Sequence, residues 1–142
     1  MYVRNFGTHA LVQTPAKVNL SLEVLGKRAD GFHEIETLMI AVSVYDTLTF
    51  RASDSGQIVL HSRWGAGLAA QANARRQADC DGGEEPFGDL PAGPENIVWR
   101  AADLLRRRAG TSAGAEIHLL KRIPAAAGLG GASSDAAAPV VG

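Results

Sequence analysis

Apolar and polar residues alternate along much of the first half of the chain, and this pattern predicts extended strands. Residues 18–24 read Val-Asn-Leu-Ser-Leu-Glu-Val, which has the two-residue period of a strand with one buried face. Because the next runs follow after short turns, residues 10–62 are predicted to form an antiparallel meander without helical crossovers. The other strands are predicted at residues 35–44, 47–50 and 57–60, and the turns at residues 26–31 and 54–56.

A helix and one more strand are predicted in the second half. Residues 95–108 have a helical period of apolar positions, and Gly110 is expected to end this helix. Residues 115–121 predict a strand. The predicted apolar face of the helix consists of Ile97, Ala101, Leu104 and Leu105.

Residues 62–93 differ from the rest of the chain, because Gly, Ala, Arg and acidic residues dominate them. Such a long stretch without periodicity is unusual inside a compact domain, so we interpret it as a surface insertion with at most a short helix at residues 68–73. Its charges alternate in sign, which is typical of solvated surface rather than of a binding patch. Cys80 lies in this insertion and is assigned no role.

The composition narrows the classes of function. The chain has 142 residues and a formal net charge of −1, which argues against a surface devoted to nucleic acid or anionic membrane. A single cysteine excludes an intramolecular disulfide and a cysteine-based zinc cluster. No apolar run approaches the roughly 20 residues of a membrane span, and residues 1–17 lack the apolar core of a secretory signal. A single cytoplasmic domain is therefore expected.

A glycine-rich loop joins the last predicted strand to the start of an alanine-rich helix. Gly128, Gly130 and Gly131 allow close backbone approach, so that successive N–H groups can point at one anion. Ser133 or Ser134 is expected to cap the helix, whose N-terminal dipole favours phosphate. The glycines precede Ala-Ser rather than Lys-Ser/Thr, and they follow several strands and a helix. This arrangement fits neither a P-loop nor a Rossmann fold.

Three segments carry a more specific pattern. Residues 15–22 read Pro-Ala-Lys-Val-Asn-Leu-Ser-Leu, and residues 26–38 contain Arg-Ala-Asp-Gly-Phe-His; the glycine-rich loop lies within residues 124–138. Together they resemble the GHMP kinase superfamily, and residues 95–105 are similar to the helix between these motifs in that family. The loop alone marks the superfamily, whereas the first two segments are far more specific.

The resemblance implies an α+β fold in which a mixed, mostly antiparallel sheet is covered on one face by helices. Residues 1–142 would form the N-terminal, ATP-binding domain of a GHMP kinase, incomplete and without the family's C-terminal domain. Because the helix starting near Ser133 would be short, we expect an exposed apolar face and marginal stability.

Within the superfamily, the motifs are most similar to the kinases of non-mevalonate isoprenoid biosynthesis. This resemblance implies transfer of the γ-phosphoryl group of ATP, with Mg²⁺, to the 2-hydroxyl of a cytidine-diphosphate-linked methylerythritol. Lys17 matches the family's catalytic lysine, whose ammonium can stabilise charge on the transferred phosphoryl group and the acceptor oxygen. The family's partner aspartate belongs to a second half that is missing here, so the chain alone is expected to be inactive.

The resemblance also implies a substrate site on the first two motifs. Asn19 lies two residues after Lys17 on one strand, so both side chains are expected on the same side and Asn19 would line the acceptor pocket. Phe32 and His33 match the residues that hold the cytosine, by stacking and by a hydrogen bond to the base edge. Asp30 is interpreted as a turn residue.

The ATP site is implied by the loop and by the start of the first helix. Asn96 matches a position near the purine, although capping of the helix accounts for it equally well. If Ala132 had to adopt a left-handed conformation, phosphate affinity would suffer. The residues expected to bind ATP are Asn96, Pro124, Ala125, Ala126, Ala127, Gly128, Leu129, Gly130, Gly131, Ala132, Ser133, Ser134 and Asp135, with Ser133 or Ser134 able to reach the Mg²⁺ of Mg-ATP.

The remaining polar residues carry less signal, and three alternative functions stay open. His9, His61 and His118 share no metal-ligand spacing, so we expect surface roles for them. The arginines 106–108 suit a helix C-terminus. The alternatives are another GHMP small-molecule kinase, a non-catalytic nucleotide-binding fragment, and an RNA-binding module, which the net charge disfavours. The expected partner is a small molecule rather than nucleic acid or membrane, and the oligomeric state is left open.

Overall fold

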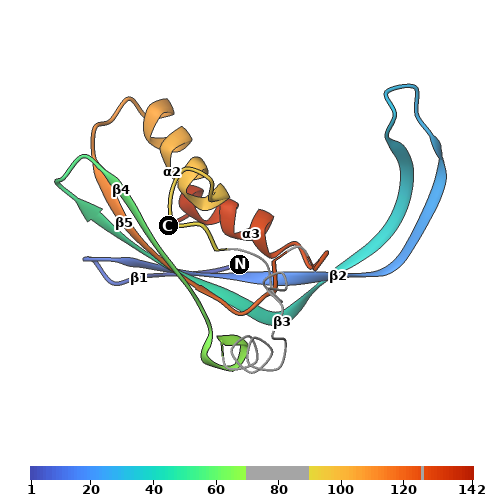
Figure 1. Ribbon diagram of the computed structural model, residues 1–142, viewed down its shortest axis with the longest axis horizontal. Coiled ribbons are helices and arrows are strands. Elements are labelled where there is room, and N and C mark those ends of the chain that lie inside the picture. Colours follow the sequence, from blue (N-terminus) through green and yellow to red (C-terminus); the bar gives the residue numbers. More distant parts are fainter. Residues whose placement is uncertain (70–89, 126) are drawn as a thin grey trace, which may run out of the picture.

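The computed structural model describes residues 1–69, 90–125 and 127–142. A five-stranded sheet in the order β1-β2-β3-β5-β4 forms its centre, and helices cover one face (Figure 1). The predicted α+β fold with a mixed, mostly antiparallel sheet is confirmed. The elements are β1 (Tyr2–Asn5), β2 (Ala10–Lys27), β3 (His33–Ser53), β4 (Ile58–Trp64), α2 (Ile97–Arg108), β5 (Gly114–Lys121), α3 (Gly131–Ala137) and the 3₁₀ turn η1 (Ala138–Val140).

The edge strand β4 departs from the predicted meander. It does not continue the antiparallel order next to β3 but pairs in parallel with β5, with Leu60 opposite Ile117. The later strand β5 lies between β3 and β4 and pairs antiparallel with β3. The last step of the predicted meander is therefore wrong, because the chain returns through α2 and this crossover permits a parallel pair.

The strands β2 and β3 are continuous and extend beyond the sheet as a two-stranded arm (Figure 1). From Thr14 onward β2 pairs with β3 alone, and register shifts between Pro15 and Ala16 and at two later points mark bulges that increase the bend. Residues 19–27 are exposed on both faces. The predicted burial of one face over residues 18–24 is therefore wrong, since no described element packs on the arm. Its exposed large apolar side chains are Leu20, Leu22, Val24, Leu25, Ile35, Leu38, Met39 and Ile40.

The core lies between the sheet and the two helices. Val12, Leu48 and Ile117 project from three strands and are completely buried, and Val98 of α2 and Ala138 pack against them. Large apolar side chains are exposed, as expected; most of them lie on the arm, and others lie on α2 and on the sheet strands, where Val3 of β1 and Val59 of β4 are exposed.

The helix α2 is rotated relative to its predicted orientation. Its N-terminal cap and the Gly110 stop (φ +65°) are as expected, but Val98 and Trp99 face the core while Ile97 and Leu104 are exposed. The indole Nε1 of Trp99 donates to the carbonyl of Ile58 at 3.0 Å, which fixes the helix against β4. The apolar periodicity did not predict this orientation, because Trp99 and Ala102, rather than the leucines, form the face of α2 that packs on the core.

The described residues include no helix that is long and apolar enough to cross a membrane. Of the predicted insertion 62–93, residues 62–64 instead belong to β4, and residues 66–69 form a helical turn. Residues 70–89, which include Cys80, lie outside the described residues.

Candidate functional site

The glycine-rich loop lies directly against Lys17. The backbone N–H of Lys17 donates to the carbonyl of Leu129 at 2.9 Å. A Cβ built on Gly130 would lie 2.9 Å from Cγ of Lys17, closer than real side chains allow. The structure therefore brings together the first and third sequence motifs, which lie at opposite ends of the chain.

Lys17 and Asn19 share one side of β2, as predicted. The Lys17 ammonium donates to Oδ1 of Asn19 at 3.1 Å. Asn19 is exposed and Lys17 is half-buried, so the ammonium is accessible beside the loop. This pair places a cation and an amide at the edge of the loop, a combination that suits an anionic ligand with a neighbouring hydroxyl group.

The helix α3 starts earlier than the serines predict. Its N-cap is Gly130 (φ +70°), which makes no side-chain cap bond, so Ser133 and Ser134 lie inside the helix. The predicted serine cap is therefore wrong. Among the described loop residues, Gly128 and Gly130 have left-handed φ values, whereas Ala132 lies within α3 in a right-handed conformation, so alanine at this position imposes no backbone strain.

A buried polar network holds the loop from below. The Lys121 ammonium donates to carboxylate oxygens of both Asp46 and Asp135, the latter at 2.9 Å, and the Thr14 hydroxyl donates to the other oxygen of Asp135. The Asp46 carboxylate also accepts the backbone N–H of Ile123 at 2.9 Å, and that of Arg122. Four elements and the start of the loop are therefore tied together.

This network contains residues that the sequence analysis missed. Thr14, Asp46 and Lys121 come from three different strands, and only their register brings them together. Asp135 was expected to bind ATP, but the residue is 1 % exposed and its carboxylate lies in this network beneath the loop. Alternation offered one signal: Asp46 and Lys121 are charged residues at strand positions that continue a buried row.

The network carries one carboxylate more than it has ammonium groups. Burial raises the pKa of Asp135 to about 6; the nearby Lys121 charge opposes this shift and the Asp46 carboxylate adds to it. Because a proton on Asp135 would neutralise the excess charge, the protonation of this residue is linked to the packing of α3 on the sheet.

Phe32 and His33 lie at the far tip of the arm, away from α3 (Figure 1). Phe32 is 73 % exposed, which leaves its ring free to stack. The Asp30 carboxylate accepts the N–H of Phe32 at 3.1 Å and pairs with Arg28 at 2.9 Å. The interpretation of Asp30 as a turn residue is confirmed, whereas the structure does not bring Phe32 or His33 into contact with Lys17 or the loop.

Asn96 is the N-cap of α2. Its Oδ1 accepts the N–H of Val98 at 2.9 Å, and its Nδ2 donates to the carbonyl of Pro91 at 2.8 Å. The residue is 7 % exposed. The capping account of Asn96 is therefore confirmed.

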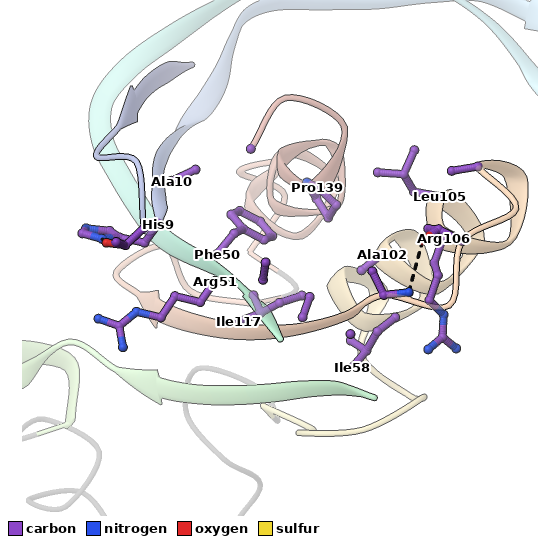
Figure 2. A pocket seen from close by; sticks show the side chains of 18 of the residues that line it. His9, Ala10, Phe50, Arg51, Ile58, Ala102, Leu105, Arg106, Ile117 and Pro139 are labelled. Atoms are coloured by element: carbon purple, nitrogen blue, oxygen red, sulfur yellow. Dashed lines mark hydrogen bonds between the residues drawn. The ribbon is translucent and has the colours of Figure 1, made fainter. Parts of the chain in front are cut away.

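A cavity of about 450 Å³ lies elsewhere, between the ends of the sheet strands and α2 (Figure 2). Phe50, Ile58, Ile117 and Leu105 give it a mainly apolar lining. None of the predicted site residues lines it. Its walls are sheet and helix surface, without the loop or Lys17.

Two of the histidines that were expected to be isolated meet in the structure. His61 of β4 and His118 of β5 stack with ring centroids 4.8 Å apart. The expected surface position of His61 and His118 is confirmed, but the parallel pairing of β4 with β5, which was not foreseen, also brings them together with Glu116 in a group that could hold a metal ion.

Comparison with known proteins bears directly on this arrangement. Residues 96–142 match the family model described as the GHMP kinases N terminal domain. A 4-diphosphocytidyl-2-C-methyl-D-erythritol kinase of Pelotomaculum thermopropionicum is 47 % identical over 126 residues, which cover 89 % of this chain and 36 % of the relative. The kinase of the same name from a Synechococcus species is 44 % identical and covers 92 % of this chain.

The fold of the chain is that of the GHMP kinase N-terminal domain.

Solved structures agree with this assignment. A crystal structure of 4-(cytidine 5'-diphospho)-2C-methyl-D-erythritol kinase matches 92 % of this chain with a TM-score of 0.63 and 37 % identity. A homoserine kinase from Cytophaga hutchinsonii matches with a TM-score of 0.60 at 20 % identity, which supports the GHMP kinase fold alone. The chain spans about a third of the length of the curated relatives it matches, 36 % for each of the two described above.

Proposed function

We propose that this chain supplies part of the active site of a kinase that transfers the γ-phosphoryl group of ATP to the 2-hydroxyl of 4-diphosphocytidyl-2-C-methyl-D-erythritol. The contact of Lys17 with the glycine-rich loop carries this proposal. The proposal is supported by relatives of that name at 36–47 % identity. Since those relatives are named as kinases, nucleotide binding without catalysis is not favoured.

The loop residues fit a phosphate donor. Gly128 and Gly130 have left-handed φ values of 72° and 70°, a backbone form that lets neighbouring N–H groups converge on an anion. Leu129 between them anchors the loop to Lys17 through its carbonyl. We assign phosphate binding to the loop from Pro124 to Gly131 and to the exposed Ser133 in the first turn of α3.

Lys17 is the proposed catalytic residue. Its ammonium would neutralise charge on the transferred phosphoryl group, and Asn19, which accepts a hydrogen bond from it, would hold that ammonium toward the acceptor hydroxyl. Phosphoryl transfer depends mainly on such positioning and charge neutralisation. Mg²⁺, when bound with ATP, would neutralise phosphate charge. Ser133 is the better candidate to contact it, because Ser134 is half-buried.

Phe32 and His33 are the proposed cytidine-reading residues. The exposed Phe32 ring offers a face for base stacking, and the Asp30 turn fixes the backbone of Phe32. His33 follows it at the first position of β3 and would bond the edge of the base. Cytoplasmic location belongs to the same proposal, since the reaction draws on ATP and a phosphorylated metabolite.

A chimera tests this proposal. This chain replaces the matching segment of the Pelotomaculum thermopropionicum relative, and the chimera is offered 4-diphosphocytidyl-2-C-methyl-D-erythritol, homoserine or mevalonate with Mg-ATP. We expect phosphorylation of the cytidine-linked alcohol at least 100-fold above the other two. The intact relative is the positive control, and the chain alone is expected to show no turnover. A folded chimera that prefers homoserine or mevalonate contradicts the substrate assignment.

A further inference from the structure

Two histidines lie face to face at the edge of the sheet, away from the glycine-rich loop. His61 of the edge strand β4 is the direct register partner of His118 in β5, and the planes of their stacked rings are 21° apart. Their strand neighbours Leu60 and Ile117 are buried in the core. Because successive strand residues face opposite sides, both imidazoles lie on the exposed face of the sheet, opposite α2 and α3.

A carboxylate completes the cluster. Glu116 precedes His118 by two residues and therefore shares its face. Its Oε1 lies 3.1 Å from Nε2 of His118 and 3.7 Å from Nε2 of His61. One donor atom from each of the three residues falls within 4.8 Å of the others.

We propose that His61, Glu116 and His118 bind a divalent transition-metal ion of the Zn²⁺ class. Imidazole nitrogens and a carboxylate oxygen are ligands that Zn²⁺, Cu²⁺ and Ni²⁺ accept, whereas Mg²⁺ and Ca²⁺ prefer oxygen alone. Zn–N bonds of about 2.0–2.1 Å in a tetrahedral site imply ligand atoms roughly 3.3 Å apart. The two carboxylate–imidazole distances, 3.1 and 3.7 Å, lie on either side of that spacing, and all three donor atoms lie within 4.8 Å of one another, so side-chain rotation that closes the widest pair assembles the site.

The surroundings define the kind of site. Three protein ligands leave a fourth position open to water or to a small anion. Arg51, the register partner of Glu116 on β3, and Arg63, two residues after His61, project on the same face. These cations lower the affinity for a bare metal ion and favour an anion as its fourth ligand. The site is therefore an exchangeable surface site that joins the edge strand β4 to β5.

The test titrates ZnCl₂ into the 142-residue chain by calorimetry at pH 7.5. We expect one equivalent to bind, and the melting temperature to rise with added Zn²⁺ because the ion links two strands of the folded state. His61→Asn and His118→Asn should each weaken binding at least tenfold. His9→Asn, a histidine whose ring stacks on Phe6 outside this cluster, is the matched control and should leave binding unchanged.

A second measurement does not depend on variants. Electron paramagnetic resonance of the chain with one equivalent of Cu²⁺ should show hyperfine coupling to two nitrogens. Absence of saturable Zn²⁺ binding at pH 7.5 overturns the proposal. If the His61→Asn and His118→Asn variants bind Zn²⁺ as tightly as the wild type, the proposal is overturned. A Cu²⁺ spectrum that shows no coupling to two nitrogens also overturns it.

Discussion

Gly130 contacts Lys17 so closely that a Cβ on the glycine would lie 2.9 Å from Cγ of the lysine. The carbonyl of Leu129, immediately before this glycine, accepts the backbone N–H of Lys17. The position of the candidate catalytic lysine therefore depends on the conformation of the loop. Any change that displaces the loop at this point is expected to move the ammonium as well.

The first prediction compares two loop glycines. Gly130→Ala and Gly128→Ala both force alanine into a left-handed conformation, which costs about 1–2 kcal/mol. Only Gly130→Ala also places a methyl group against Lys17, since nothing lies within 4 Å of a Cβ at Gly128. We expect Gly130→Ala to lower the free energy of unfolding by about 1–3 kcal/mol more than Gly128→Ala. Urea unfolding of both variants measures this, and equal losses would contradict the close contact.

The second prediction concerns the pH dependence of stability. Burial raises the pKa of Asp135 to about 6, above the usual value of roughly 3.9. Between about pH 4 and pH 6 the folded state thus binds more protons than the unfolded state, so this residue lowers stability as the pH rises through that interval. The change amounts to about 3 kcal/mol and levels off above pH 6.

Asp135→Asn should abolish this loss of stability with rising pH. Asparagine carries no charge and keeps one oxygen, which can accept from the Lys121 ammonium or from the Thr14 hydroxyl, while its NH₂ group takes the place of the other acceptor. We expect the free energy of unfolding of the wild type relative to Asp135→Asn to fall by about 3 kcal/mol between pH 4 and pH 7. Asp54→Asn, in an exposed turn, should change none of this dependence. Parallel curves for the wild type and Asp135→Asn would show that Asp135 is not protonated in this range.

The third prediction separates two roles of Asn96. Asn96→Ala removes the acceptor for the N–H of Val98 and should destabilise the chain by about 0.5–2 kcal/mol. Asn96→Asp keeps that acceptor and loses only the bond to Pro91, so it should retain more of the stability. Chemical denaturation of the two variants decides this. Unchanged stability in Asn96→Ala would mean that capping is not the role of this residue.

The fourth prediction addresses recognition of cytidine. Phe32→Ala should weaken binding of the cytidine-linked substrate by about 10- to 100-fold, because an aromatic–base stack contributes about 1–3 kcal/mol. Mg-ATP affinity should stay the same, since the arm tip lies away from the loop (Figure 1). His33→Ala should show the same selectivity. Phe6→Ala, also an exposed aromatic, is the control. Calorimetry with both ligands measures the two affinities, and equal losses for both would count against this assignment.

The sequence predicted those parts of the fold that depend on local pattern. The strand at 115–121, the Gly110 stop and the Asp30 turn depend on alternation, positive φ and a short side-chain bond, all of which act within a few residues. It failed for β4, whose partner is decided by a later strand rather than by its own residues. It also failed for the face of α2, which the bond from Trp99 to Ile58 sets.

The candidate site shows the same division. The motifs around Lys17 and Gly130 were recognised as separate segments, and the structure brings them into contact. The supporting network of Asp46 and Lys121 was missed, because charged residues in strands are expected to be exposed until the strand register shows them facing one another. The pairing of His61 with His118 depended on an unforeseen parallel strand pair in the same way.

The rate of phosphoryl transfer after replacement of Lys17 tests the central claim most directly. In the chimera with the Pelotomaculum thermopropionicum relative, Lys17→Ala should lower kcat for phosphorylation of 4-diphosphocytidyl-2-C-methyl-D-erythritol by at least about 100-fold, because it removes charge stabilisation of the transferred group. Arg108→Ala, at the exposed end of α2, is the control and should leave kcat unchanged. A folded Lys17→Ala chimera that keeps the kcat of the unmodified chimera would contradict the assignment of this lysine to the reaction.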